Sequence, residues 1–302
     1  MGTETTGTSR EATGTGTQTN GQPSGPEPAP TGRPTVFRQI DEVPEPMRAL
    51  LLAALQQMAK SPEIGQVRRV AEAALSVRLG ERVLDAGCGA GEVARGLAGQ
   101  VAPGGQVTAV DASQAMIDHA AAQDGGAGIR YQVADVEHLP FDDHSFDAVR
   151  CERVLQHLAE PDRGLGELVR VARPGARVCV IDTDWLSLCG DGVPEDLVAA
   201  VTSHLLSQGT MHNTTMGRTL RRRMVRAGLT GVLAQPVPLC FTDPAGAAVV
   251  LPMFNPQVPP QARMVPDELR ERWFDAVAEA GRRDEFLAVL TMWVVTGTVP
   301  LE

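Results

Sequence analysis

Three aspartates, Asp85, Asp111 and Asp135, each lie at the end of a short segment that is predicted to form a β-strand. The carboxyl ends of parallel strands meet at one edge of a sheet, and α/β folds bind their ligands at that edge. We therefore predict that the three carboxylates line a single ligand site.

A glycine loop follows the first of these aspartates, in the run Asp85-Ala86-Gly87-Cys88-Gly89-Ala90-Gly91. Glycine adopts positive φ without strain, and a helix predicted after Gly91 directs its free N–H groups to the same place. A dinucleotide-binding loop spaces its glycines differently, and a carboxylate here would repel a pyrophosphate. Asp85 instead suits a cofactor that carries positive charge, such as the sulfonium and ammonium groups of S-adenosylmethionine.

Asp111 lies twenty residues after Gly91, at the end of the second predicted strand. A carboxylate in that place can accept hydrogen bonds from both hydroxyls of a ribose. Because NAD and S-adenosylmethionine both contain a ribose, Asp111 indicates a nucleoside without choosing between the two cofactors.

These residues resemble the motifs of the class I S-adenosylmethionine-dependent methyltransferases. Between about residues 80 and 185, segments such as Leu139-Pro140-Phe141 and Ala172-Arg173-Pro174-Gly175 are similar to the quinone-biosynthesis (menaquinone and ubiquinone) branch of small-molecule methyltransferases. The resemblance implies an α/β fold of the Rossmann type, with a seven-stranded, mostly parallel sheet and helices on both faces. It also implies transfer of a methyl group from S-adenosylmethionine to an oxygen, carbon or nitrogen of a small organic molecule, for example a specialised metabolite.

Two other functions are compatible with the same motifs. A family member can bind S-adenosylmethionine and catalyse a different step, such as a cyclisation. The fold can also serve as a binding module without turnover. Release of S-adenosylhomocysteine distinguishes a methyltransferase from both.

The resemblance assigns further residues to the cofactor. Ala112 and Met116 are expected to flank the adenine, although a methionine on a helix can also fill a gap in the core. Asp135 is expected to accept a hydrogen bond from the adenine amine, and the backbone N–H of Val136 to donate to a ring nitrogen. Cys151, near the end of the fourth predicted strand, completes this set. The expected cofactor residues are Asp85, Gly87, Gly89, Gly91, Asp111, Ala112, Met116, Asp135, Val136 and Cys151.

The chemistry of the family lies after the fourth predicted strand, in the segment that contains Glu152, Arg153 and His157. Methyltransferases that modify DNA bases or glutamine carry an Asn/Asp-Pro-Pro-aromatic run there, which this chain lacks. His157 is the first candidate for a general base, because imidazole accepts protons near neutral pH; a structural histidine is the alternative. Glu152 is the second candidate, or else a polar ligand for the methionine part of the cofactor, and Arg153 is expected to pair with it.

The substrate is expected to contact Arg153, Asp184 and Trp185, the last two of which follow a fifth strand at residues 177–181. The acids around Asp184 also suggest a metal site. We expect no metal, because the six histidines are scattered and none forms a pair at ligand spacing.

The chain is expected to fold in three parts. Residues 1–35 are rich in Thr, Gly, Pro and Ser and contain almost no large apolar side chain, which predicts a disordered tail. Residues 36–80 contain two amphipathic helices that form a lid over the site or simply pad the sheet. Residues 81–302 form the methyltransferase core, with a substrate cap at about 241–285 inserted before the last strand.

Composition limits the partners. The net charge of −10 argues against nucleic acid, because phosphate binding needs a basic surface. No apolar run is long enough to span a bilayer, and the five cysteines show no pairing pattern. We therefore expect a cytoplasmic monomer or homodimer whose partner is a small molecule and not a membrane.

Overall fold

The computed structural model describes residues 1–2, 40–45, 47–207, 213–258 and 264–301 of the chain. The chain divides into two units, residues 1–31 and residues 32–302. The predicted tail at residues 1–35 lies outside the described residues except for residues 1–2, so its disorder stays a prediction. Every described helix and strand belongs to the second unit.

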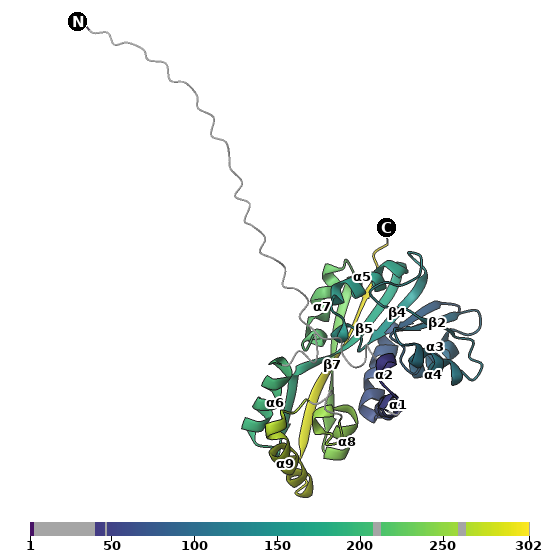
Figure 1. The fold of residues 1–302 in the computed structure, drawn as a ribbon. Coiled ribbons are helices and arrows are strands. Elements are labelled where there is room, and N and C mark those ends of the chain that lie inside the picture. Colours follow the sequence, from purple (N-terminus) through teal and green to yellow (C-terminus); the bar gives the residue numbers. More distant parts are fainter. Residues whose placement is uncertain (3–39, 46, 208–212, 259–263, 302) are drawn as a thin grey trace. The chain divides into compact units, whose positions relative to one another are not determined.

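A seven-stranded sheet forms the centre of the second unit (Figure 1). Its strand order is β3-β2-β1-β4-β5-β7-β6, and β7 runs antiparallel to both of its neighbours while the other adjacent strands are parallel. The strands are β1 (Arg82–Ala86), β2 (Gln106–Asp111), β3 (Arg130–Val133), β4 (Phe146–Glu152), β5 (Ala172–Asp191), β6 (Thr230–Phe241) and β7 (Leu287–Thr298). This arrangement confirms the predicted Rossmann-type, mostly parallel sheet.

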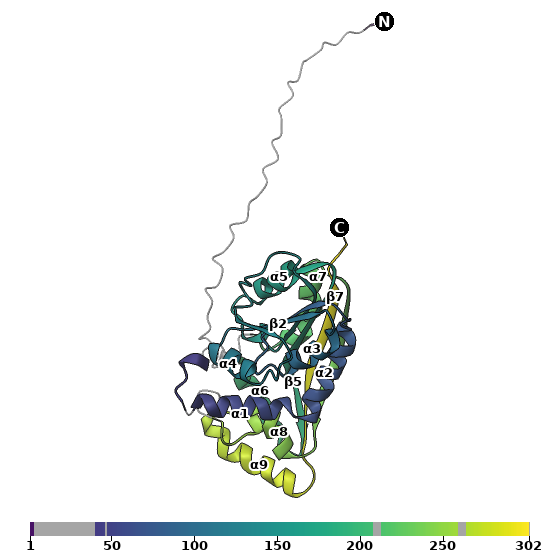
Figure 2. The same ribbon diagram turned by 90° about the vertical axis from the view of Figure 1, so that its right-hand side faces the viewer.

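Helices cover both faces of the sheet (Figure 2). They are α1 (Met47–Ala59), α2 (Pro62–Leu75), α3 (Glu92–Val101), α4 (Gln114–Ala122), α5 (Pro161–Val171), α6 (Glu195–Ser207), α7 (Met216–Arg226), α8 (Pro244–Val250) and α9 (Arg270–Arg282). Apolar residues of α2, α3, α4, α6, α8 and α9 join one buried cluster, and those of α5 and α7 join the other. The short 3-10 turns include η1 (Ile40–Glu42) and η2 (Leu155–His157). Two cores on opposite faces of one sheet result.

Strand position explains the burial pattern along each strand. Every residue of β4 is buried, as expected for a central strand that has helices on both faces. Along β7, buried residues alternate with half-buried ones through most of the strand, as expected where one face meets the core and the other is more open. Pro236 and Pro238 lie in β6, which is the edge strand, the place in a sheet where proline is tolerated.

Strand β5 is much longer than the sequence pattern indicates. The predicted strand covers residues 177–181, whereas β5 continues through Asp182 and Asp184 and ends at Asp191, with an irregularity between Asp184 and Cys189. Pairing with β7 along both halves of the strand holds this polar stretch in place. The acids near Asp184 therefore lie inside a strand and not at its end.

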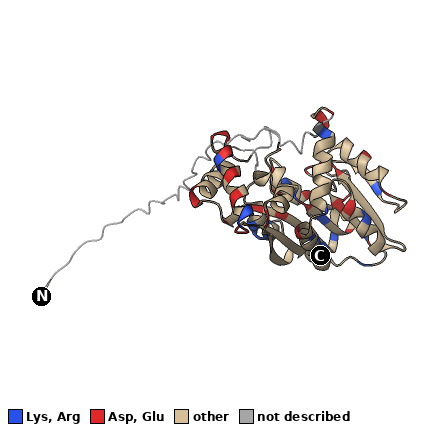
Figure 3. Cartoon of the chain, turned by 90° about the horizontal axis from the view of Figure 1, so that it is seen from below, with Lys and Arg blue, Asp and Glu red and all other residues tan. Residues whose placement is uncertain are grey.

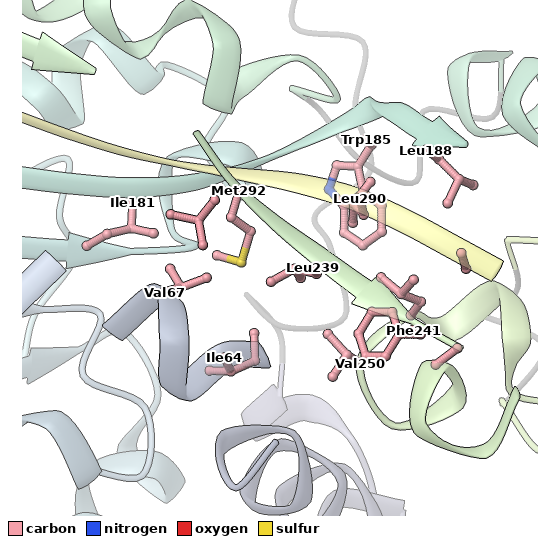
Figure 4. Packing of buried hydrophobic residues seen from close by; sticks show 14 of the residues in the cluster. Ile64, Val67, Ile181, Trp185, Leu188, Leu239, Phe241, Val250, Leu290 and Met292 are labelled. Carbon is pink, nitrogen blue, oxygen red and sulfur yellow. The ribbon is translucent and has the colours of Figure 1, made fainter. Parts of the chain in front are cut away.

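The long strands β5, β7 and β6 carry an apolar surface that faces helices α2 and α8. Figure 4 shows Trp185 and Leu188 of β5, Leu239 of β6 and Leu290 and Met292 of β7 on this surface. Ile64 of α2 and Val250 of α8 lie opposite them. The antiparallel part of the sheet thus supplies a buried apolar floor beside the parallel part.

Charged residues of both signs are interspersed over the elements in the view of Figure 3. On α7, Arg221, Arg222 and Arg226 are exposed while Leu220 and Met224 are buried. These arginines therefore form the outer, solvent-facing side of an amphipathic helix. No helix among the described residues is both long and apolar enough to cross a bilayer.

Gly217 provides a test of the packing between α7 and the sheet. A Cβ atom at this position would lie 2.7 Å from the carbonyl oxygen of Asp182 and 2.8 Å from Cδ1 of Trp293. Because the strand backbone cannot move aside cheaply, we predict that Gly217→Ala lowers the free energy of unfolding by about 1–3 kcal/mol, measured by urea denaturation.

The matched control is Gly99→Ala in α3. Gly99 is exposed, and a Cβ atom there would have no neighbour within 4 Å. This variant should be neutral or more stable by up to about 1 kcal/mol, because alanine favours a helix. Equal destabilisation in both variants would contradict close packing at Gly217.

Candidate functional site

Two adjoining cavities lie at the carboxyl ends of the parallel strands. The larger has a volume of about 240 Å³ and the smaller about 70 Å³. Leu55, Gly87, Gly89, Glu152 and Arg153 line both. The two spaces therefore form one continuous candidate site.

The glycine loop connects β1 to α3 with a left-handed backbone at each of its three glycines, Gly87, Gly89 and Gly91. At Gly87 a Cβ atom would lie 2.1 Å from Cγ2 of Val154, so no other residue fits without a shift. Gly87 and Gly89 line the larger cavity. Gly91 lines neither cavity and instead begins α3 as its N-cap.

Asp111 lies at the end of β2 and lines the larger cavity. Its Oδ2 accepts a hydrogen bond from the N–H of Gly89, and its Oδ1 accepts one from the N–H of Ser113, each at 3.0 Å. A carboxylate oxygen has a second lone pair, so both oxygens can still accept from a ligand. Burial raises the pKa of Asp111, and these two N–H groups oppose that rise.

Four more of the expected cofactor residues line the same cavity: Ala112, Met116, Asp135 and Val136. They come from the ends of β2 and β3 and from the first turn of α4. Oδ1 of Asp135 also accepts from the N–H of Glu137 at 2.9 Å, which fixes the turn after β3. The structure thus brings together the residues expected around a nucleoside.

A buried ion cluster surrounds Asp85, which is fully buried and lines the smaller cavity. The guanidinium of Arg150 donates to Oδ1 of Asp85 at 3.2 Å and also to Oε2 of Glu152. Arg68 of α2 adds a second cation beside Glu152, with 3.4 Å between its Nε and Oε2. Oδ2 of Asp85 is buried and has no hydrogen-bond partner among the described residues.

Charge determines the protonation of this cluster. Burial alone would raise the pKa of Glu152, but Arg150, Arg68 and Arg153 hold it well below its usual range. Burial raises the pKa of Asp85, and Arg150 opposes the rise. Glu152 is therefore a stable anion and a weak base, although sequence reasoning named it as a candidate base.

Arg153 lies at the junction of the two cavities with a strained backbone, at φ 56°. Its N–H donates to the carbonyl of Ile181 at 2.8 Å, which helps to hold that conformation. Its Nε lies 3.2 Å from Oε1 of Glu152, which confirms the predicted pairing. Its Nη1 lies 2.9 Å from Sδ of Met58 in α1, so the guanidinium also contacts the N-terminal helices.

The structure does not bring Cys151 or Asp184 to either cavity. Cys151 is buried in the cluster that includes α5 and α7, because alternation along β4 directs it away from its neighbour Glu152. Asp184 is buried and pairs with Arg218 of α7. The expected contact of these two residues with cofactor or substrate is therefore not seen.

Trp185 and His157 do line the larger cavity, together with Gln156, which sequence reasoning missed. Gln156 is 3% exposed, and its side chain contacts both of the others. No feature of the sequence signals this role, because a single glutamine beside a histidine is an ordinary surface pattern. Only the arrangement of η2 against β5 reveals it.

The far end of the larger cavity is apolar. Helices α1 and α2 contribute Leu55, Met58 and Ile64. The segment inserted before β7 contributes the wall opposite, and β5, β6 and β7 contribute the floor. The remaining apolar lining residues are Trp185, Leu239, Val250, Leu251, Pro252, Met264, Leu290 and Met292.

The residues present fit S-adenosylmethionine. The unpartnered Oδ2 of Asp85 suits an ammonium group, and the cations beside it suit a carboxylate. The two oxygens of Asp111 suit a ribose, and the loop at Gly89 has open space where a side chain would otherwise project. These groups are held by different elements and converge on one connected space.

Sequence comparisons agree with this fit. A family model described as a methyltransferase domain matches residues 84–180. An uncharacterized 37.1 kDa protein in transposon TN4556 of Streptomyces fradiae is 34% identical over 80% of this chain and 69% of its own length. The ubiquinone/menaquinone biosynthesis C-methyltransferase UbiE of Bordetella avium is 32% identical, over 49% of this chain and 55% of its own length. The chain thus matches about half the length of that curated methyltransferase.

Solved structures show the same fold. The YcgJ protein from Bacillus subtilis matches 80% of this chain and 98% of its own, with a TM-score of 0.53 and 21% identity. The [4+2]-cyclase SpnF matches 78% of this chain and 82% of its own, with a TM-score of 0.52 and 21% identity. The family model, the relatives and the residues of the site together show that this chain belongs to the class I S-adenosylmethionine-dependent methyltransferases and that its cofactor is S-adenosylmethionine. Within that family, the chain resembles the quinone-biosynthesis enzymes.

Proposed function

We propose that this enzyme methylates an apolar small molecule at a hydroxyl oxygen or an acidic carbon. The observation that carries the proposal is the continuity of the larger cavity, which runs from the glycine loop to an apolar floor. Among the described lining residues, the ionisable ones are Asp111, Asp135, Glu152, Arg153 and His157, which come from the glycine-loop side of the sheet and from η2. An acceptor with a large uncharged body and one polar reactive group fits such a space.

Apolar burial supplies the binding energy for the body of the substrate. Each 100 Å² of apolar surface removed from water contributes about 2.5 kcal/mol. A charged group placed between Leu290 and Val250 would lose its hydration with no partner among the described lining residues. This contrast favours neutral, lipophilic acceptors over polar metabolites.

The residues around the cofactor are proposed to divide its binding as follows. Asp85 takes the ammonium group, Asp111 the ribose, and Asp135 with the N–H of Val136 the adenine edge. When bound, S-adenosylmethionine supplies a methyl group on a cationic sulfur that an aligned nucleophile can displace.

His157 is the proposed general base. It lines the cavity at η2, one turn beyond the end of β4, close to where the polar end of the space meets the apolar end. We prefer His157 to Glu152 as the base, because the carboxylate of Glu152 is already paired with three guanidinium groups. A hydroxyl or acidic carbon needs such a base, whereas a neutral amine does not.

The acceptor class can be tested with a panel of compounds. Hydroxylated naphthalenes and benzenes are compared with and without alkyl tails, and the release of S-adenosylhomocysteine is measured. We expect release with the tailed phenols and little with carboxylated or phosphorylated analogues. Turnover restricted to charged acceptors would refute the proposal, and cofactor binding without any methyl transfer would favour a binding module or another reaction.

The ribose assignment predicts the effect of Asp111→Ala. The variant loses two charge-assisted contacts, so the affinity for S-adenosylhomocysteine should fall by about 2–4 kcal/mol in a calorimetric titration. Asp118→Ala is the control, since Asp118 is an exposed acid of α4 outside both cavities. If the folded Asp111→Ala variant binds S-adenosylhomocysteine with unchanged affinity, the assignment of Asp111 to the ribose is wrong.

The base assignment predicts the effect of His157→Ala and His157→Gln. Both should lower turnover of the acceptor found in the panel by about 10²- to 10⁴-fold, with cofactor affinity nearly unchanged. Glutamine keeps a hydrogen bond but accepts no proton in this pH range. The exposed His138, replaced by alanine, serves as control.

Two outcomes would count against this assignment. Native turnover in the folded variants would place the base elsewhere or show that none is needed. Loss of folding in both variants, seen in thermal melts, would show a structural histidine.

A further inference from the structure

The indole of Trp185 fixes the orientation of the Gln156 side chain. Nε1 of Trp185 lies 2.8 Å from Oε1 of Gln156, and both residues are buried. An indole N–H can only donate, so the amide atom that faces it must be the oxygen. The oxygen and nitrogen of this amide are therefore assigned by chemistry and not by convention.

The other end of the same amide faces His157. Nε2 of Gln156 lies 3.3 Å from Nε2 of His157. The amide nitrogen can only donate, so the imidazole Nε2 must accept, and an acceptor nitrogen carries no proton. In the neutral ring, the proton then resides on Nδ1.

We propose that Gln156 is a positioning residue that holds His157 in the tautomer with an unprotonated Nε2, the form that can take a proton from the acceptor. The inference rests on the proposed role of His157 as the base. It adds a chain of two hydrogen bonds, from Trp185 to Gln156 and from Gln156 to His157, which we call the relay. Through it, Trp185 in the wall of the substrate cavity determines which nitrogen of His157 is free to accept a proton.

The main chain of η2 is anchored so that the relay keeps its geometry. The N–H of Gln156 donates to Oδ2 of Asp182 at 3.0 Å, and its carbonyl accepts from the N–H of Asn213 at 3.2 Å. The side-chain amide of Asn213 donates to the carbonyls of Leu155 and Leu158 on either side. Because Gln156 is buried and its main chain is held on both sides, its side-chain amide has little freedom to turn around.

The relay connects substrate binding to the base. Trp185, Gln156 and His157 all line the larger cavity, so an acceptor that packs on the indole meets the imidazole on the same wall. The acceptor hydroxyl would take the place of the amide N–H at Nε2 of His157. A ring protonated at Nε2 would instead direct its N–H at the amide N–H groups, which disfavours that form.

Nitrogen NMR of the full-length protein tests the relay without turnover. The ¹⁵N shifts of the imidazole distinguish the two neutral tautomers at a pH about 1.5 units above the titration range of imidazole. His157→Asn identifies the His157 signals, and the other five histidines serve as internal references. We expect the Nδ1–H tautomer in the native protein, and finding the Nε2–H tautomer would overturn the inference.

Three substitutions make the test sharper. In Gln156→Glu, a carboxylate accepts from Trp185 and from the ring, so the His157 tautomer should reverse to Nε2–H. Gln156→Leu and Trp185→Phe should each leave a mixture of tautomers. Because Trp185→Phe leaves Gln156 in place, the test still works if one of the Gln156 variants fails to fold. An unchanged tautomer in the folded variants would overturn the inference.

Activity measurements separate this inference from the proposed function. Gln156→Glu should lower kcat about 10- to 100-fold while the Kd for S-adenosylhomocysteine changes by less than about 2-fold. If His157→Gln keeps full activity but the tautomer responds as expected, the base assignment fails and the relay holds. If His157→Gln is inactive and the tautomer does not respond to Gln156, the relay fails and the base assignment holds.

Discussion

One buried guanidinium, that of Arg150, lies between two carboxylates at the ends of β1 and β4. Asp85 and Arg150 are directly paired in the register of these two strands, and Glu152 lies two residues further along β4. Two carboxylates this close together in a buried place would repel each other, and one would take up a proton. The cation between the two carboxylates weakens that repulsion, and breaking such a pair typically costs about 3–5 kcal/mol.

The rest of the cofactor site follows from that cluster. Arg68 and Arg153 add two more guanidinium groups beside Glu152, and these groups suit a carboxylate. The free oxygen of Asp85 suits the neighbouring ammonium group. The zwitterionic amino-acid part of the cofactor therefore suits the cluster around Asp85. The uncharged floor on β5, β6 and β7 suits an apolar acceptor instead.

Local backbone constraints made much of the site predictable from sequence. Gly87 and Gly89 are needed because of left-handed φ values, Asp111 ends β2, and Asp135 lies two residues after β3. These signals depend on residues close together in the chain. The seven-stranded, mostly parallel sheet followed from the family resemblance.

The features that sequence reasoning missed depend on distant partners. In the sequence, Arg150 looks like an ordinary charged residue. Only the register of β4 with β1 shows that it lies beside Asp85. The length of β5 depends on its pairing with β7, which lies far along the chain. Within β5, Thr183 and Trp185 line the cavity, so alternation directs Asp184 to the opposite face, where it pairs with Arg218. Gln156 gains its role only through Trp185 on a different element.

The contact between Gly87 and Val154 limits how the substrate range of this enzyme can be changed. The glycine loop and the segment before His157 touch with no space for one more carbon, since a Cβ atom at Gly87 would lie 2.1 Å from Val154. A larger side chain at position 154 would press against the cofactor loop at Gly87. Redesign for new acceptors therefore belongs at Leu239, Val250 and Leu290, which line the same cavity from β6, α8 and β7.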